Sequence, residues 1–166
     1  MKRSLYFDID GTILGLSSGR PKSELASGQL ELAIRESGFD DLICVGNFVE
    51  VVRIVSTVNS EYDGLGALYS LCQGTFQDEA WFRRVTRLVG DPKNRALELS
   101  LDSDWWYMDD LAHDYMSLAG LQAVFERERG RRVLVPSDEG DGADVIEWLR
   151  SARYPLQSTS EAAGDG

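Results

Sequence analysis

The alternation of apolar and polar residues along the chain predicts strands that alternate with helices. Short runs rich in aliphatic and aromatic residues are typical of buried strands, and they occur at residues 5–7, 41–46, 105–108 and 132–135. Apolar residues at helical spacing predict helices at residues 23–38, 78–89, 92–101, 114–129 and 143–149. Residues 48–58 are so densely apolar that a helix and a strand fit them equally well. The alternation indicates an α/β fold, in which helical layers cover a mostly parallel sheet.

The length of the chain, 166 residues, predicts one domain around a single core. We assign residues 1–155 to that domain. Residues 59–90, where glycines interrupt apolar segments, are interpreted as a small lid or a helical insertion. Residues 156–166 are small and polar, which is typical of a disordered tail.

Charge and composition argue against some classes of partner. The chain has 17 basic and 28 acidic residues and a net charge of −11, which disfavours binding to nucleic acids. No apolar stretch is long enough to cross a membrane, and the first apolar run is too short for a secretory signal. Cys44 and Cys72 lie in apolar surroundings and are expected in the core rather than in a disulfide. These features predict a cytoplasmic protein that binds neither nucleic acids nor membranes.

Two aspartates come directly after the first predicted strand. Asp8 and Asp10 are two positions apart, so in an extended chain their carboxylates point to the same side. Such a pair can bind a cation, or one carboxylate can attack a substrate while the other transfers a proton. Gly11 supplies the backbone freedom that a sharp turn after the strand needs. The plainer alternative is a simple turn, because Asp-Gly is also a common hairpin signal.

A second pair of acids follows the strand predicted at residues 105–108. Asp109 and Asp110 stand at its carboxyl end, as Asp8 and Asp10 do after the first strand. In open parallel sheets, ligands bind beyond the carboxyl ends of the strands. If the two strands are neighbours, both acidic pairs meet at one edge of the sheet, which predicts a metal site there.

The sequence Asp8-Ile-Asp10-Gly11-Thr12 resembles the DxDGT motif of the haloacid dehalogenase superfamily. The resemblance extends over residues 4–150 and implies a Rossmann-like three-layer sandwich. It implies that Asp8 is the nucleophile and Asp10 the general acid and base. Asp109 and Asp110 match the acidic pair of the fourth motif, so the resemblance implies Mg²⁺ held by Asp8, Asp10 and Asp110, with Asp109 as a further candidate ligand.

The remaining motifs of that superfamily match less well. Lys93 is the best candidate for the phosphate-binding lysine, although an exposed lysine at the end of a helix fits the pattern equally well. The expected Ser or Thr after the second strand is missing, because Gly46 and Asn47 stand there. We therefore expect the phosphate to contact Gly11, Thr12, Gly46 and Asn47, with backbone N–H groups at a helix start contributing.

A different alignment of the second motif would place Ser56 or Thr57 at the hydroxyl position. The segment between the first motif and the second strand is too short for a full cap domain, so the resemblance implies a capless or small-cap member. An open site of this kind suits a bulky substrate or closure by a second copy of the chain in a homodimer.

These residues predict a Mg²⁺-dependent phosphohydrolase that acts through an aspartyl-phosphate. Its substrate would be a phosphorylated small molecule or a phosphoprotein. The main alternative is a catalytically silent domain that binds a phosphorylated ligand or protein partner, which the missing Ser or Thr favours. A dehalogenase is a weaker alternative, because such enzymes need no aspartate at the position of Asp10.

Overall fold

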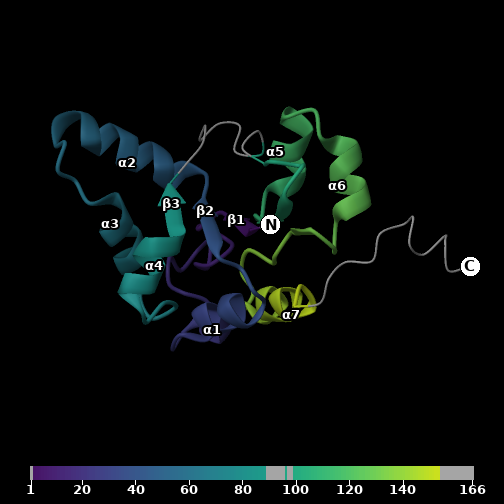
Figure 1. Cartoon of the computed structure of the whole chain (residues 1–166), viewed down its shortest axis with the longest axis horizontal. Coiled ribbons are helices and arrows are strands. Elements are labelled where there is room, and N and C mark those ends of the chain that lie inside the picture. Colours follow the sequence, from purple (N-terminus) through teal and green to yellow (C-terminus); the bar gives the residue numbers. More distant parts are fainter. Residues whose placement is uncertain (1, 89–95, 97–98, 154–166) are drawn as a thin grey trace, which may run out of the picture.

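The central element of the fold is a parallel five-stranded sheet (Figure 1). The computed structural model describes residues 2–88, 96 and 99–153. Within these residues the strand order is β3-β2-β1-β4-β5. The strands are β1 (Arg3–Phe7), β2 (Asp41–Cys44), β3 (Thr86–Leu88), β4 (Asp104–Met108) and β5 (Val133–Leu134). The predicted α/β fold with a parallel sheet is confirmed.

Strand β1 lies in the centre of the sheet, and its neighbours end level with it. Phe7 is paired with Cys44 of β2 on one side and with Met108 of β4 on the other. The backbone N–H of Asp8 donates to the carbonyl of Met108 at 3.1 Å. The residues that follow β1, β2 and β4 therefore leave the sheet side by side at the carboxyl ends of the strands. The predicted meeting of the two acidic pairs requires this arrangement.

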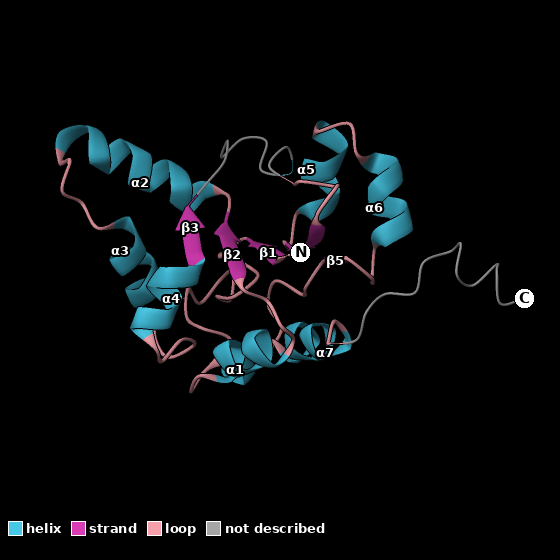
Figure 2. Cartoon of the chain, in the orientation of Figure 1, coloured by secondary structure: helices cyan, strands magenta, loops and turns pink. Residues whose placement is uncertain are grey.

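Helices cover both faces of the sheet and complete a Rossmann-like three-layer sandwich (Figure 2). Leu5 and Phe7 of β1 belong to one core, and Tyr6 between them belongs to the other. Helices α1 (Gln29–Glu36) and α7 (Ala143–Ser151) pack against the first core, while α5 (Ala112–Leu118) and α6 (Gln122–Glu128) pack against the second. The alternation of side chains along β1 thus divides the interior into two cores.

Three helices connect β2 to β3. They are α2 (Asn47–Val58), α3 (Gly64–Leu71) and α4 (Glu79–Val85). The ambiguous segment 48–58 is therefore helical. The apolar side chains of α3 and α4, such as Leu68 and Phe82, belong to the same core as α1 and α7, whereas α2 has no buried residue.

The predicted helix over residues 78–89 is wrong at its carboxyl end. Helix α4 ends at Val85, and Thr86 begins strand β3 at the edge of the sheet. Thr86 is paired with Leu42 of β2. Hydrogen bonds to a strand more than forty residues earlier in the sequence stabilise this extended segment, and a local periodicity does not register them.

Two other predicted helices are interrupted by residues with positive φ. The segment 23–38 contains a short 3₁₀ turn, η1 (Ser23–Leu25), and then α1, because Ser27 and Gly28 have φ of 55° and 74°. The segment 114–129 is divided into α5 and α6, with Gly120 between them at φ 75°. Left-handed residues end a helix because they cannot continue its hydrogen bonding.

Further predictions concern the two cysteines, membrane-spanning helices and the segments 92–101 and 156–166. Cys44 and Cys72 are buried and not bonded to each other, as predicted. None of the helices in the described part of the chain has the length and apolarity that a membrane span needs. The predicted helix 92–101 lies mostly outside the described residues, and the predicted tail 156–166 lies entirely outside them.

Candidate functional site

A cleft of about 330 Å³ opens at the carboxyl edge of the sheet. It is lined by residues from the ends of β1, β2 and β4, namely Asp8, Asp10, Leu16, Asn47, Asp110 and Leu111. Four of these six were singled out from the sequence, namely Asp8, Asp10, Asn47 and Asp110. The strand order therefore brings together residues that are about one hundred positions apart in the chain.

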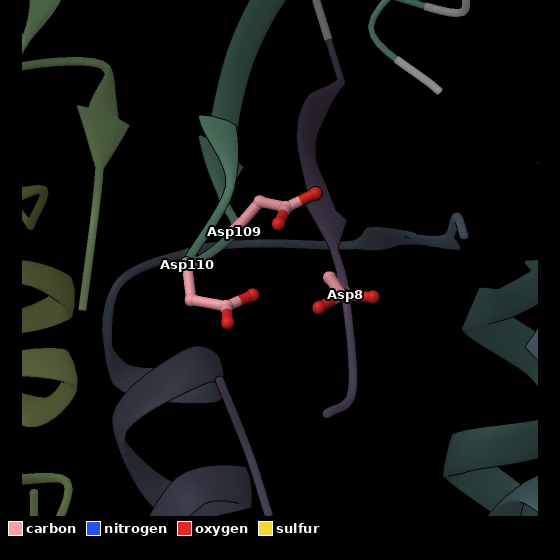
Figure 3. A group of neighbouring side chains, drawn as sticks. All are labelled: Asp8, Asp109 and Asp110. Atoms are coloured by element: carbon pink, nitrogen blue, oxygen red, sulfur yellow. The ribbon is translucent and has the colours of Figure 1, made fainter. Parts of the chain in front are cut away.

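Three carboxylates gather at the base of this cleft and directly behind it. Asp8, Asp109 and Asp110 each offer an oxygen, and these oxygens lie within 4.8 Å of one another. In Figure 3 the carboxyl groups of Asp8 and Asp110 face one another from the ends of β1 and β4. Carboxylate oxygens are the ligands that Mg²⁺ and Ca²⁺ prefer, so the donor set suits a hard divalent cation.

The crowding of negative charge is most evident at Asp110. Burial and, to a lesser extent, the neighbouring Asp109 together raise the pKa of Asp110 to about 6, although a hydrogen bond with Asp8 opposes the shift. A carboxylic acid in such surroundings is costly to ionise, and additional positive charge beside it would lower that cost. A bound cation supplies that charge and lowers the cost.

Asp109 occupies a different place from Asp110. It is fully buried and does not line the cleft. One of its oxygens accepts a hydrogen bond from the Tyr107 hydroxyl at 2.7 Å, and the other accepts one from the backbone N–H of Leu111 at 2.8 Å. Asp109 therefore fixes the turn after β4, and Asp110 is the member of the pair that faces the cleft.

Gly11 and Thr12 lie behind the acidic cluster. The Thr12 hydroxyl is buried and accepts a hydrogen bond from the backbone N–H of Asp110 at 3.2 Å, which ties the two acidic motifs together. Gly11 has φ of 80°, and a Cβ atom there would lie 2.3 Å from a carboxylate oxygen of Asp110. A glycine is thus required for this close approach. Neither residue lines the cleft, so the structure places both against Asp110.

The turn that contains Asp10 is closed by backbone hydrogen bonds. The carbonyl of Ile9 accepts from the N–H groups of Thr12, Ile13 and Leu14 at 3.1, 2.9 and 3.1 Å. The N–H of Gly11 donates to the carbonyl of Leu14 at 2.8 Å. These bonds hold the turn in one conformation, and Asp10 is exposed at its outer side, where it lines the cleft.

The opposite wall of the cleft begins with Gly46 and Asn47. Gly46 is buried with φ of 101° and ψ of −157°, a conformation that is essentially restricted to glycine. A threonine at this position would be strained, so the missing hydroxyl of the second motif cannot be restored there without cost. Asn47 is exposed, begins α2 and lines the cleft, as the sequence suggested.

Ser56 and Thr57 do not replace that hydroxyl. They lie near the end of α2, roughly 14 Å along the helix from its first residue at 1.5 Å per residue. The Thr57 hydroxyl donates to the carbonyl of Ile54 within the same helix. The alternative alignment of the second motif is therefore wrong.

Lys22 is a residue of this site that the sequence did not reveal. Its side chain is buried, and its ammonium group donates to the carbonyls of Gly11 at 2.8 Å and Ser137 at 2.6 Å. Burial lowers the pKa of Lys22, and the nearby carboxylates of Asp144 and Asp110 oppose that effect. Lys22 thus joins the loop after β1 to the loop after β5. Nothing in its sequence neighbourhood distinguishes it from a surface lysine.

The candidate phosphate-binding lysine, Lys93, lies outside the described residues. No family model matches the chain, and no curated protein or solved structure gives a significant match. The functional argument therefore depends on the geometry of the cleft and on the chemistry of its residues.

Proposed function

We propose that the protein is a Mg²⁺-dependent phosphohydrolase of the haloacid dehalogenase type, which acts through an aspartyl-phosphate. The observation that supports this most is the convergence of Asp8 and Asp110, whose oxygens lie within 4.8 Å, in a cleft that Asp10 also lines. A nucleophilic carboxylate, a cation ligand and a group that transfers protons are the three elements that this reaction needs.

In the proposed reaction, Asp8 and Asp10 have successive roles. A carboxylate oxygen of Asp8 attacks phosphorus and forms an O–P bond, while the bond from phosphorus to the leaving alkoxide breaks. Asp10 gives its proton to that alkoxide and later takes a proton from a water molecule. The resulting hydroxide attacks the aspartyl-phosphate, releases inorganic phosphate and restores the Asp8 carboxylate.

The residues present fit a divalent cation. The carboxylates of Asp8 and Asp110 would bind it, together with the backbone carbonyl of Asp10, as the motif implies. When bound, Mg²⁺ offsets the repulsion between the Asp8 carboxylate and the phosphoryl oxygens. Asp109 and Thr12 hold Asp110 in place through the hydrogen bonds described above.

The alternative is a catalytically silent domain of the same type that binds a phosphorylated ligand. It is favoured by the wall that begins at Gly46, where a hydroxyl is missing and the backbone conformation disfavours any side chain. Asn47 is then the side chain on this wall that lines the cleft and offers hydrogen-bond donors to a phosphate.

The experiment that separates the two proposals is a phosphatase assay with and without Mg²⁺ on wild type and on Asp8→Asn. We expect turnover only in wild type with Mg²⁺, because the amide keeps the shape of the side chain but loses the nucleophile. Asp40→Asn is the matched control, since Asp40 is exposed and precedes β2 at the other end of the strands. Turnover by a carefully purified Asp8→Asn variant would refute the covalent mechanism.

Beryllium fluoride provides a second measurement, because its adduct with an aspartate mimics an aspartyl-phosphate. We expect an adduct on Asp8 in the presence of Mg²⁺. If wild type shows neither turnover on a broad panel of phosphate esters nor this adduct, the enzyme proposal fails and the silent binding domain replaces it.

A further inference from the structure

We propose that the substrate is a phosphomonoester whose leaving group is uncharged and apolar, and that Leu16 and Leu111 bind this group. The inference depends on the proposed phosphohydrolase function and adds the class of substrate to it. The observation behind it is that two leucines line the cleft beside the acids.

Two leucines form the apolar part of the cleft. Leu16 is 52% exposed and Leu111 is 45% exposed, although both are large apolar residues. Each is anchored through its backbone, since the N–H of Leu16 donates to the carbonyl of Asp138 at 3.0 Å and that of Leu111 to Asp109 at 2.8 Å. Their positions beside Asp8 and Asp10 are therefore set by the same loops that form the site. A ligand that covers them removes apolar surface from water, which favours binding.

Within the described part of the chain, the same cleft offers no positive side chain to a second anionic group. Among the described residues that line it, none is a lysine or an arginine. Lys22 lies close to Asp110, but it is only 3% exposed and its ammonium group already donates to the carbonyls of Gly11 and Ser137. A leaving group with its own phosphate or carboxylate would therefore find no partner among these residues.

The loops beside Leu16 add negative charge. Glu139 accepts hydrogen bonds from the backbone N–H of Ser17 at 2.9 Å and from its hydroxyl at 2.6 Å. Asp138 also lies beside Leu16, because its backbone carbonyl accepts a hydrogen bond from the Leu16 N–H at 3.0 Å. An anionic leaving group would meet these carboxylates, whereas an uncharged one would not.

A polar, neutral leaving group gains less from this cleft. A sugar needs several hydrogen-bond partners to replace the water that it loses. Apart from the acids that the reaction uses, Asn47 is the polar side chain among the described lining residues. The lining thus favours an alkyl or aryl group over a polyol.

The test compares three phosphomonoesters that release a primary alkoxide, so that their intrinsic reactivities are similar. They are hexyl phosphate, glycerol 3-phosphate and 2-phosphoglycolate, with apolar, polar and anionic leaving groups. We expect kcat/KM to be at least about tenfold higher for hexyl phosphate than for glycerol 3-phosphate, and lowest for 2-phosphoglycolate. Equal values, or a preference for 2-phosphoglycolate, would overturn the inference.

Variants of the two leucines test which residues are responsible. Leu16→Ser and Leu111→Ser should each lower kcat/KM for hexyl phosphate by about tenfold, mainly through KM, and should lower kcat/KM for glycerol 3-phosphate by a much smaller factor. Leu118→Ser is the matched control, because Leu118 is 68% exposed on α5 and does not line the cleft. An equal loss for all substrates would contradict the assignment.

The beryllium fluoride adduct separates the two levels of proposal. An adduct on Asp8 without the expected substrate preference, or without turnover of any of the three esters, overturns the substrate class alone. Absence of both the adduct and turnover overturns the proposed function, and the substrate class with it.

Discussion

The two walls of the cleft are built in opposite ways. The acidic wall, at the ends of β1 and β4, is fixed by the backbone bonds around Ile9, the Thr12–Asp110 hydrogen bond and the close approach of Gly11. The opposite wall is the start of α2, a helix without a buried residue. On that helix Val51, Ile54 and Val58 are all exposed.

The difference shows where the fold specifies geometry. A cation site needs oxygens at fixed separations, and each contact behind Asp110 removes a conformation in which those separations would change. In the proposed function, a phosphate oxygen would accept hydrogen bonds from several directions, so Asn47 at an exposed helix start would be sufficient. Substitutions in the acidic wall should therefore change the free energy of unfolding strongly, and substitutions in the α2 wall should change it little.

The largest effect is expected for Gly11→Ala. Its new Cβ would lie 2.3 Å from Asp110, and its φ of 80° is unfavourable for alanine. Strain and overpacking together should cost about 3 kcal/mol of unfolding free energy, and Mg²⁺ affinity should fall by at least about tenfold. Gly19→Ala is the control, because Gly19 has φ of 65° and nothing within 4 Å of the added atom. Denaturation measures the free energy of unfolding of both variants, and calorimetry measures their Mg²⁺ affinity. Equal losses in the two variants would show that the close approach to Asp110 is unimportant.

Lys22→Met should have the next largest effect. The substitution removes the ammonium group that donates to the carbonyls of Gly11 and Ser137. The free energy of unfolding, measured by urea denaturation, should fall by about 2 to 3 kcal/mol. Lys2→Met is the control, since Lys2 is exposed. If the two variants were equally stable, Lys22 would have no role in holding the loops after β1 and β5.

A pH dependence is expected from Asp110. Its pKa is raised from 3.8 to about 6 in the folded protein, so the protonated form is favoured by folding. The resulting stability is fully present below pH 4 and is lost as the pH rises through 6. Without a divalent cation, Asp110→Asn should therefore become more stable than wild type by about 2 kcal/mol between pH 4 and pH 7.

Urea denaturation of both proteins across this range, in the presence of a chelator, measures that difference. Added Mg²⁺ should stabilise wild type above pH 6 and reduce the advantage of the variant, because the ionised carboxylate then has a partner. A constant difference across the range would contradict the crowding of charge at Asp110.

The smallest effect is expected for Asn47→Ala on the α2 wall. Loss of one hydrogen bond to a phosphate oxygen should reduce kcat/KM or phosphate affinity by about tenfold, equivalent to about 1.4 kcal/mol. The free energy of unfolding should change by less than about 0.5 kcal/mol, because Asn47 is exposed. A large loss of stability would mean that this wall is as tightly specified as the acidic one.

The sequence was most informative where the signal is local. A strand followed by Asp8, Asp10, Gly11 and Thr12 is a contiguous pattern, and the structure places Asp8 and Asp10 in the cleft. The order of strands and helices is also a sum of local periodicities, and it predicted the fold class. The turn at Gly11 follows the same logic, because a sharp exit from a strand depends on one residue's φ.

The remaining features depend on contacts between distant parts of the chain. Thr86 is in a strand because β2 pairs with it. Asp109 and Asp110 occupy different places because the Tyr107 hydroxyl bonds to Asp109 and the Thr12 hydroxyl bonds to the N–H of Asp110. Lys22 is buried because two carbonyls from separate loops accept its hydrogen bonds. Hydrophobic period and motif spacing encode only what neighbouring residues do. They therefore determined the fold class and the first acidic motif. Tertiary packing decided that Asp110 rather than Asp109 faces the cleft, and that the buried Lys22 joins the two loops beside it.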